Sequence, residues 1–390
     1  MVDLENDLCS GCGACSNICP QCAIEMKEDE KGFLKPNVDS EKCTDCHACK
    51  NICPLNYNEV KNFDTPLVFS AINNNEQIRL KSSSGGLFYL FAKNILSENG
   101  VVFGCVWDEN MQTKHIATQS LTELEKMFCS KYVQSHTKNT FKEVREFLLE
   151  GKKVLYSGTP CQIAGLKSFL RKEYDNLYLI DLICHGVPSR KTFEMFKGEI
   201  CKEKNITEKI TNINMRSKIT DWGKPFTTVV STENNEYVIP FEQNSFLESF
   251  LHNFNIGDSC INCKFNSLPR YGDITVGDFC GVDEFDKELN DKKGTSILLI
   301  NSKKGKNLFE YIKNDCSIRE IPFDSAIKFN QNVVKSSKPN LFRDKFFKNI
   351  LSGKSLKESM ALSRNNYPSV LKMLFKMQPQ FVKDMIKRFI

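Results

Sequence analysis

Apolar residues follow two different periods through the middle of the chain. Short continuous apolar runs predict buried strands, and apolar residues that recur every three to four positions predict helices. Strands are expected at 101–106, 154–157 and 177–183, and helices at 87–96 and 163–170. Because strands and helices alternate along the chain, we expect an α/β domain with parallel strands at residues 61–300.

The composition is that of a globular protein. The chain has 390 residues, of which 26% are charged and 41% hydrophobic, so two or three domains are expected and a disordered chain is excluded. No run reaches the roughly 18 apolar residues that span a bilayer, which excludes an integral membrane protein. The first residues show no secretory signal. The eighteen cysteines are therefore expected to stay reduced in a cytoplasmic protein rather than to form a disulfide scaffold.

Charge is distributed unevenly along the chain. The formal net charge is +5, but the first 60 residues carry −6 and the last 90 carry +12. We expect residues 301–390 to form a basic helical extension. At its end, in 370–390, apolar residues recur at helical spacing, and the opposite side carries Lys372, Lys376, Lys383 and Lys387. This segment either docks on the protein's own core or makes peripheral contact with an anionic membrane surface, and its charge would also attract an acidic redox partner.

A cysteine pattern occurs twice near the start of the chain. The first copy is Cys9, Cys12, Cys15 and Cys19 before Pro20, and the second, 34 residues later, is Cys43, Cys46, Cys49 and Cys53 before Pro54. Eight of the twelve positions are identical in the two copies. This C-x2-C-x2-C-x3-C-P run is the bacterial ferredoxin signature, in which each run gives three thiolates to one 4Fe–4S cluster and its fourth to the other. The pattern predicts a dicluster ferredoxin domain at residues 1–60.

The crossed pattern assigns the eight thiols to two clusters. One cluster is expected on Cys9, Cys12, Cys15 and Cys53, and the other on Cys43, Cys46, Cys49 and Cys19. A pair of zinc sites is the alternative, because C-x-x-C spacing also suits zinc.

Three features of the middle domain carry candidate chemistry. Serines and glycines at 82–86 precede the first helix, where they either cradle a phosphate or simply cap the helix. Cys161 opens the helix after the second strand, and Cys184 follows the third strand. Both cysteines are expected at the carboxyl edge of the sheet, where open α/β sheets bind their ligands.

The role of Cys161 has three interpretations. A thiol at a helix N-terminus can be a low-pKa nucleophile, and a cysteine can also be a buried structural residue. The third interpretation is that Cys161, Cys184 and the C-x-x-C pair Cys260 and Cys263 converge on a third cluster. The remaining cysteines of this region are expected to be buried and structural: Cys105, Cys129, Cys201, Cys280 and Cys316.

Several motifs stand in a fixed order along the chain. They are the turn at 82–86, Lys131-Tyr132-Val133-Gln134-Ser135, Gly158-Thr159-Pro160-Cys161-Gln162, the run from Asp181 to Ser189, Met215-Arg216-Ser217-Lys218 with Trp222, the C-x-x-C pair, and Gly277-Asp278. This order resembles the coenzyme F-420 hydrogenase/dehydrogenase beta-subunit family, in its bacterial-type branch with a fused dicluster ferredoxin domain. The likeness extends to about residue 347. It implies an α/β (α+β) flavin domain between a small N-terminal dicluster ferredoxin-like domain and a helical C-terminal extension.

The resemblance implies FAD and a 4Fe–4S cluster in the middle domain. It implies that the cluster ligands are Cys161, Cys184, Cys260 and Cys263, and that the flavin contacts are Ser83, Ser84, Gly85, Gly86, Lys131, Gly158 and Thr159. Arg216, Lys218 and Arg270 are either contacts for an anionic substrate or solvated surface charges. The sequence departs from the family where Cys280 stands in place of an expected tryptophan, which leaves the ligand assignment open.

The function that the resemblance implies is that of an iron–sulfur flavoprotein oxidoreductase. Such a protein passes electrons between ferredoxin-type clusters and a two-electron substrate at the flavin, either a reduced deazaflavin or an organic acceptor. The expected partners are a ferredoxin or another redox protein and an anionic small molecule, with no nucleic acid. No catalytic residue is assigned. Two alternatives remain: a non-catalytic electron-relay subunit of a larger complex, and thiol catalysis by Cys161.

Overall fold

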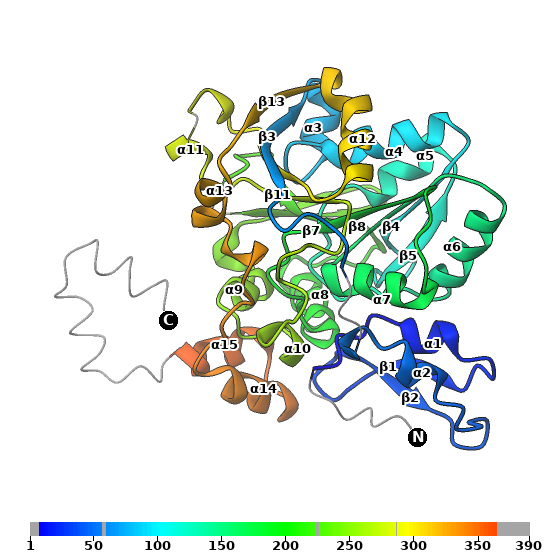
Figure 1. Cartoon of the computed structure of the whole chain (residues 1–390). Coiled ribbons are helices and arrows are strands. Elements are labelled where there is room, and N and C mark those ends of the chain that lie inside the picture. Colours follow the sequence, from blue (N-terminus) through cyan, green and yellow to red (C-terminus); the bar gives the residue numbers. More distant parts are fainter. Residues whose placement is uncertain (1–7, 57–59, 224–225, 286, 365–390) are drawn as a thin grey trace.

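A mixed eight-stranded sheet forms the centre of the protein in a computed structural model of the chain (Figure 1). The structure describes residues 8–56, 60–223, 226–285 and 287–364. In spatial order the strands are β13 (Cys316–Glu320), β3 (Leu67–Asn73), β12 (Ser296–Ile300), β11 (Ile274–Asp278), β7 (Leu177–Leu182), β6 (Val154–Gly158), β4 (Val101–Trp107) and β5 (Thr113–Thr118). Strands β13, β12 and β5 run against the other five. The α/β architecture is confirmed, but the expectation of parallel strands alone is wrong.

Helices cover both faces of this sheet (Figure 1). One face carries α6 (Thr140–Leu149) and α7 (Pro160–Leu170), and the other carries α4 (Leu87–Ser97) and α12 (Lys303–Ile312). Successive residues of a strand point to opposite faces. In β4, Val101 and Phe103 pack with α6 and α7, whereas Val102 and Val106 pack with α4. Burial on both faces explains why the strands appear in the sequence as continuous apolar runs.

The predicted elements of this domain are present close to their predicted limits. The largest shift is in α7, which begins at Pro160 rather than at residue 163. Thr159 and Gln162 form a capping box there, and proline suits the first helical turn because it needs no N–H partner. Strands β6 and β7 are parallel neighbours, so the residues that follow them, including Cys161 and Cys184, leave the sheet at the same edge.

The sheet continues beyond residue 300, where we expected the domain to end. Strand β13 pairs with β3 along its whole length, and α12 packs on the sheet just before it. Residues 303–320 thus belong to the central domain, with β13 as a strand of its sheet and α12 as a helix packed on it. Pairing between segments so far apart leaves no signal in the local periodicity of the sequence.

A second, smaller sheet was not predicted. It consists of antiparallel β8 (Ile210–Ser217), β9 (Thr227–Thr232) and β10 (Glu236–Ile239). The helices around it are α8 (Arg190–Glu203), α9 (Ser245–Leu251), α14 (Arg343–Leu351) and α15 (Leu356–Arg364). Phe193 and Phe246 meet Phe346 and Phe347 of α14 in its apolar core. The described part of the basic extension therefore packs on the protein itself.

Short elements join these units. They are α3 (Glu76–Lys81), α5 (Leu121–Leu124), α10 (Asp258–Ile261), α11 (Val282–Phe285) and α13 (Phe323–Phe329), with 3-10 turns at Pro54–Asn56, Glu125–Met127, Phe241–Gln243, Lys287–Leu289, Lys313–Asp315 and Gln331–Val333. Within the described ranges, none of the helices combines the length and apolar character needed to cross a membrane. The amphipathic segment expected at 370–390 lies outside those ranges.

The amino-terminal head repeats one backbone shape twice. It contains α1 (Ala14–Ile18), β1 (Ile24–Glu28), β2 (Leu34–Val38) and α2 (Ala48–Asn51). In the first cysteine loop, Gly11 and Gly13 have φ angles of 67° and 82°. At the matching positions of the second loop, Asp45 and His47 have φ angles of 53° and 56°. The second loop thus keeps, with side chains present, a left-handed backbone that glycine adopts more easily.

The head is docked on the central domain along α1. Ala14 and Ile52 lie in the apolar core that α6 and α7 form on the sheet. Asn17 Nδ2 donates to Lys138 O at 2.8 Å, and Ser168 Oγ donates to Ile52 O at 2.5 Å. These contacts join the segments that carry the two cysteine loops to the helix that carries Cys161.

A second contact fixes the other side of the head. Phe33, between β1 and β2, is 4% exposed and packs edge-on against Phe347 with ring centres 6.0 Å apart. Arg190 Nε donates to Glu28 Oε1 at 2.8 Å. Contacts on two sides therefore hold the head against the rest of the protein.

Candidate functional site

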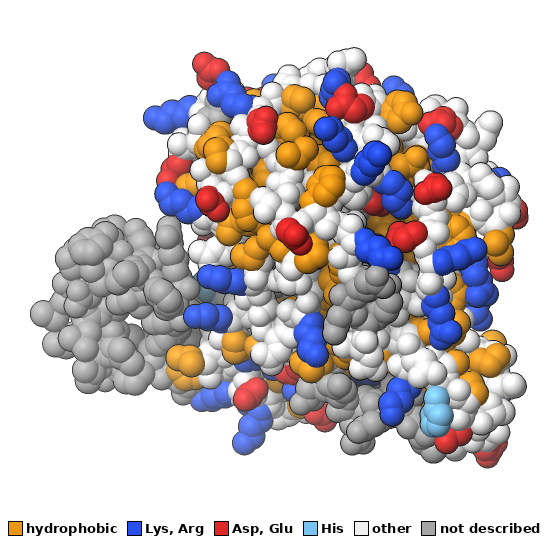
Figure 2. Space-filling view, in the orientation of Figure 1, with side chains coloured by type: hydrophobic (Ala, Val, Ile, Leu, Met, Phe, Trp, Pro, Cys, Tyr) orange, Lys and Arg blue, Asp and Glu red, His pale blue; other side chains and the backbone are white. Residues whose placement is uncertain are grey.

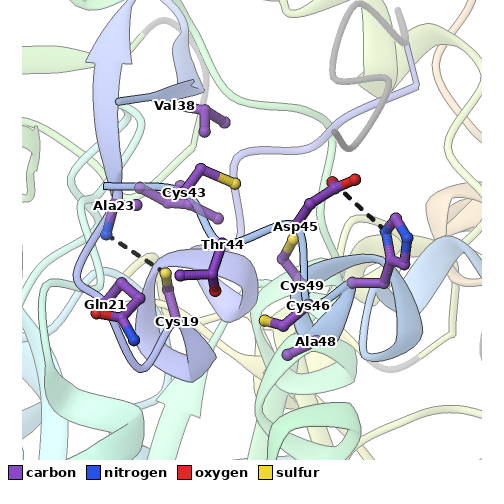
Figure 3. Close-up of a pocket in the computed structure, with 12 residues that line it drawn as sticks. Cys19, Gln21, Ala23, Val38, Cys43, Thr44, Asp45, Cys46, Ala48 and Cys49 are labelled. Atoms are coloured by element: carbon purple, nitrogen blue, oxygen red, sulfur yellow. Dashed lines mark hydrogen bonds and ion pairs between the residues drawn. The ribbon is translucent and has the colours of Figure 1, made fainter. Parts of the chain in front are cut away.

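Four cysteines of the head line one pocket (Figure 3). They are Cys19, Cys43, Cys46 and Cys49, and we call them the outer thiol set. The backbone N–H of Ala23, which also lines the pocket, donates to Cys19 Sγ at 3.3 Å. Hydrogen bonds to ligand sulfurs are a feature of iron–sulfur sites. The outer set is the same crossed set that the sequence predicted for one 4Fe–4S cluster.

The other four cysteines of the two loops come together around α1. We call them the inner thiol set: Cys9, Cys12, Cys15 and Cys53. Nearby thiols of this set raise the pKa of Cys12, of Cys15 and of Cys53, in each case after the larger effect of burial. Burial raises the pKa of the Cys15 thiol to about 12, and the nearby Cys9 and Cys53 thiols raise it too. Deprotonating buried thiols side by side is unfavourable unless a cation balances the charge. The inner set therefore suits iron ligation.

Three separate segments bring four further thiols together at the carboxyl edge of the sheet. Cys161 lies in the first turn of α7, Cys184 follows β7, Cys260 lies in α10 and Cys263 follows that helix. The other three thiols all raise the pKa of Cys184, after the larger effect of its burial. We call these four residues the third thiol set. The structure thus groups the four cysteines that the family resemblance implied as ligands of a third cluster.

Hydrogen-bond donors point at the sulfurs of the third set. The N–H of Val187 donates to Cys260 Sγ at 3.4 Å, and the hydroxyl of Thr159 lies 3.2 Å from Cys161 Sγ. Such donors fit sulfurs that carry negative charge as cluster ligands.

None of the eighteen cysteines forms a disulfide bond. Among the residues that the structure describes, no three His, Cys, Asp or Glu side chains, the cysteines of these sets included, are grouped so as to hold a single metal ion.

The interpretation of Cys161 as a nucleophile requires its thiol to have a low pKa. Burial instead raises the pKa of Cys161 to about 12, and the thiols of Cys263 and Cys260 add to the rise. A thiol with that pKa is almost entirely protonated near neutral pH, and the thiolate is the nucleophile. The environment of Cys161 therefore argues against a free thiolate nucleophile at this position.

The serines of the turn at 82–86 are engaged within the protein. Ser83 Oγ accepts a hydrogen bond from Ser130 N at 2.6 Å, and Ser84 Oγ donates to Thr295 O at 2.9 Å. A hydroxyl that accepts one bond still has its own proton to donate. Ser83 thus retains a donor that a phosphate oxygen can use.

The two glycines of this turn serve the packing of the backbone. A Cβ on Gly85 would lie 2.5 Å from Ala71 O, and Gly86, with φ of 80°, precedes the first residue of α4. Side chains would clash at the first position and strain the backbone at the second. The glycines therefore have a structural role whether or not a ligand approaches them.

Two partly buried lysines lie beside the turn. Lys218 Nζ donates to Ser84 O at 2.7 Å and to Arg79 O at 2.6 Å, and Lys131 Nζ donates to Phe128 O at 2.8 Å and to Cys129 O at 3.3 Å. Burial lowers the pKa of Lys131. Burial, with the nearby Arg79, lowers the pKa of Lys218 to about 7. Each ammonium has three N–H groups, so a third donor on each can meet an anion.

Lys131 also reaches the part of the edge that carries the Gly158-Thr159 turn. Its charge acts on the thiol of Cys105, near the carboxyl end of β4, and β4 is the parallel neighbour of β6, which ends at Gly158. The N–H of Thr159 donates to Gln162 Oε1 at 3.0 Å, which begins α7. The predicted flavin contacts thus share one edge of the sheet with the third thiol set.

Arg216 is a fixed cation at this edge rather than a solvated surface charge. It is 5% exposed, and its guanidinium donates to Asp278 Oδ2 at 2.6 Å and to Tyr132 OH at 3.0 Å. The Phe226 ring centre lies 3.9 Å from the guanidinium carbon. Its positive charge is near enough to Lys218 to contribute to the lowered pKa of that amine.

Arg270 neither lies on the surface nor is available to a substrate. It is 0% exposed, and its guanidinium donates to Asp181 Oδ1 at 3.0 Å and to Leu182 O at 2.9 Å. Both alternatives given by the sequence for Arg270 are therefore wrong, because it forms a buried ion pair at the end of β7.

The cysteines expected to be structural differ in burial. Cys316 is buried, Cys105, Cys129 and Cys201 are partly buried, and Cys280 is exposed. Asn330 Nδ2 lies 3.9 Å from Cys280 Sγ. The expectation that Cys280 is buried is therefore wrong.

Two residues of the site gave no signal in the sequence. Arg79 is 4% exposed and pairs with Asp291 at 2.6 Å, although the local sequence shows only an amphipathic helix. Ser10 stands inside the first cysteine loop, and nothing in the sequence shows that its carbonyl oxygen accepts a hydrogen bond from Gln134 Nε2 at 3.1 Å. A family motif marks Tyr132, but the same motif does not reveal its hydrogen bond to Arg216.

Comparison with known proteins finds two domain matches in the chain. Residues 151–325 match the family model for the C terminus of the beta subunit of coenzyme F420 hydrogenase/dehydrogenase. Residues 8–57 match a 4Fe-4S dicluster domain. The first match contains the third thiol set, and the second contains the outer and inner sets.

The individual similarities are more distant. The chain is 27% identical over 269 residues to a coenzyme F420-dependent sulfite reductase of Methanocaldococcus jannaschii, which is 68% of this chain and 40% of that protein. It therefore spans about two fifths of the length of that relative. A segment covering 38% of the chain is 30% identical to one tenth of a potassium channel K2 of Plasmodium berghei.

A solved structure of the F420-reducing [NiFe] hydrogenase complex from Methanosarcina barkeri contains a chain that aligns with a TM-score of 0.47 and 16% identity. The alignment covers 72% of this chain and 97% of that one. The family assignment therefore depends on the two domain matches and on the order of the motifs. The chain thus contains a 4Fe-4S dicluster domain and a domain that matches the C terminus of the beta subunit of coenzyme F420 hydrogenase/dehydrogenase.

Proposed function

We propose that the chain is an iron–sulfur flavoprotein oxidoreductase with three 4Fe–4S clusters and one FAD. The proposed domains are a dicluster domain at about 1–60, a flavin and iron–sulfur domain that extends to about 320, and a basic helical extension after it. One observation carries the proposal: three four-cysteine sets follow one another from the head to the edge of the sheet that carries the buried cations.

Neighbouring thiol sets are close enough to affect one another's ionisation, which supports this order of the three sets. Cys49 of the outer set affects the ionisation of Cys15 in the inner set. Cys161 of the third set in turn affects that of Cys12 in the inner set. Each set is thus adjacent to the next, as a path for single electrons requires. Clusters bound to these sets would supply the one-electron steps, and the flavin would exchange electrons in pairs or singly.

The cations at the edge of the sheet support an anionic cofactor. Lys131, Lys218 and Arg216 lie in or near a turn whose Ser83 hydroxyl retains a donor, and a diphosphate needs such charged and neutral donors. We propose that Ser83, Ser84, Gly85, Gly86, Lys131, Gly158 and Thr159 line the FAD site. These residues would bind and orient the cofactor, while the apolar cores around them exclude water.

The proposed two-electron substrate is inferred from the name of a relative, the sulfite reductase of Methanocaldococcus jannaschii, to which the chain is similar over part of its length. That protein is named as a coenzyme F420-dependent enzyme, so we propose that a reduced deazaflavin, or an organic acceptor in its place, reacts at the flavin. A ferredoxin or another redox protein would exchange electrons with the outer set, whose pocket is lined by the exposed Cys46.

One assay tests the proposed cofactors. The protein is purified without oxygen, and iron, acid-labile sulfide and flavin are quantified per chain. We expect about twelve irons and one FAD, since each cluster contains four irons. Eight irons without flavin would refute the proposal and leave only the dicluster head. Turnover of a deazaflavin or a dye by the isolated chain would separate an enzyme from a relay subunit.

The pKa of Lys218 leads to a pH dependence of flavin binding. This pKa is lowered to about 7, so Lys218 is mostly an ammonium at pH 6 and mostly a neutral amine at pH 8. The ammonium form of Lys218 binds an anion, and the neutral amine does not. The affinity of the flavin-free protein for FAD should therefore fall about tenfold between pH 6 and pH 8. Quenching of flavin fluorescence on binding measures this change.

A matched variant separates Lys218 from other titrating groups. In Lys218→Arg the side chain stays charged across this range, so the affinity should vary little between pH 6 and pH 8. If the variant shows the same tenfold loss as the original protein, Lys218 does not contact the flavin's phosphates.

A further inference from the structure

A second pocket lies where the head meets the segments that carry the third thiol set. Its lining includes Cys9 of the inner set and Lys35 of β2 on one side, and Val187 and Gly257 on the other. The N–H of Val187 donates to Cys260 Sγ at 3.4 Å, and a Cβ on Gly257 would lie 3.5 Å from the same sulfur. This junction pocket therefore lies between the inner and third thiol sets.

Lys35 brings a positive charge into the junction pocket. It is partly buried, and its Nζ donates to Cys9 O at 2.9 Å. Asp258, which also lines the pocket, pairs instead with Lys31 at 3.3 Å and with Arg343 at 2.7 Å. Within the described ranges, no carboxylate lies at ion-pair distance from Lys35. Its charge is therefore not neutralised by an acidic side chain.

The place of Lys35 on β2 separates it from the outer set. Val38, at the far end of the strand, lines the pocket of the outer set (Figure 3). Lys35 stands near the other end and lines the junction pocket with Cys9. Because the energy between two charges falls as their distance grows, the charge of Lys35 acts more strongly on the inner set than on the outer set.

We infer that Lys35 raises the reduction potential of the inner cluster relative to that of the outer cluster. Reduction adds one negative charge to a cluster, and a nearby cation stabilises that charge. When one electron passes from the outer to the inner cluster, the first is oxidised and the second is reduced, and no bond or proton changes. Lys35 thus favours the electron on the head cluster that is next to the third thiol set.

This inference depends on the dicluster domain, which the match at residues 8–57 identifies. It rests on the proposed function only for the destination of the electron after the inner cluster. A charge effect and a purely structural role of Lys35 can therefore be separated within the head itself.

Two variants of Lys35 separate its charge from its hydrogen bond. Lys35→Gln removes the charge but keeps N–H donors for the carbonyl oxygen of Cys9, and Lys35→Arg keeps both. Lys27 provides a matched control, because it stands opposite Lys35 in the pairing of β1 and β2. Its Nζ lies 3.2 Å from Glu25 Oε2, and its side chain is 57% exposed. In Lys27→Gln the lost charge is one that a carboxylate and water already offset.

The experiment is a redox titration of the full chain, purified without oxygen and followed by electron paramagnetic resonance. The signal that changes in Cys46→Ala belongs to the outer cluster and the one missing in Cys161→Ala to the third, which leaves the inner cluster. In Lys35→Gln, the oxidised-to-reduced ratio of the inner cluster at a fixed potential should rise roughly threefold to tenfold. Lys35→Arg and Lys27→Gln should leave this ratio unchanged.

Four results would each overturn the inference. They are an unchanged ratio in Lys35→Gln, an equal change at the outer cluster, an equal change in Lys27→Gln, and a Lys35→Arg variant that behaves like Lys35→Gln. The titration needs neither flavin nor turnover, so it does not depend on activity. About eight irons per chain would instead refute the proposed function but leave both head clusters in place, so the two failures are distinguishable.

Discussion

Replacing Cys161 with alanine is expected to lower the iron content from about twelve to about eight per chain, because each 4Fe–4S cluster contains four irons. The third thiol set then keeps three ligands, and the altered residue is the one whose thiol affects the ionisation of Cys12 in the inner set. The outer and inner sets are complete in this variant. Electrons from a reduced ferredoxin should therefore still reach the head but no longer reach a flavin, which stopped-flow absorbance can follow.

Cys201→Ala is the control for this variant. Cys201 is also a partly buried cysteine, but it lies in α8 and packs in the core around the smaller sheet. It should retain about twelve irons. Equal iron contents in the two variants would show that Cys161 does not bind a cluster, and the cysteine would return to the candidates for a nucleophile.

The sequence predicted the head almost completely because its chemistry is local. The spacing of the cysteines determines which thiols can converge, and the short loops leave little freedom. Even there, the sequence did not reveal that Asp45 and His47 adopt the left-handed backbone of Gly11 and Gly13. That similarity follows from closing the same loop, not from the residue types.

The central sheet was predicted in part. Apolar runs and amphipathic helices identified α4, β4, β6, α7 and β7 because each has a local period. Strand β13 was missed because it is mostly polar and is defined by antiparallel pairing with β3, far away in the sequence. Strand β12 was also missed, although Ser296–Ile300 is a buried apolar run of the kind that predicts a strand. The sheet of β8, β9 and β10 was missed because these strands are rich in polar residues, and their pattern does not differ from that of a polar loop.

Burial of charged residues was the least predictable part of the site. Arg216, Lys218 and Arg270 all appeared as exposed cations or as contacts for an anion. In the structure Arg216 and Arg270 are both nearly inaccessible and are paired with Asp278 and Asp181 (the surface cations that remain on one face are blue in Figure 2). A sequence lists charges but not their partners, and only the fold decides which of them remain available to a ligand.

Replacing Arg270 with methionine is expected to destabilise the protein by about 3–5 kcal/mol, the usual result of leaving one partner of a buried ion pair without the other. Asp181 and Arg270 are both fully buried, and the carboxylate also accepts from Gly272 N at 3.0 Å and from Thr275 Oγ1 at 2.5 Å. The methionine would leave this carboxylate negative in an apolar surrounding. The midpoint of urea unfolding, followed by circular dichroism, measures the loss.

Two further variants identify the cause of this loss. Lys81 and Glu125 form an ion pair in which both side chains are more than half exposed, so Lys81→Met should cost less than about 1 kcal/mol. In the double variant Arg270→Met with Asp181→Leu no buried charge remains, so part of the stability should return. A double variant no more stable than Arg270→Met would mean that the guanidinium acts mainly through its bonds to the backbone. One of these is the bond to Leu182 O, two residues before Cys184 of the third thiol set, so iron content should then fall together with stability.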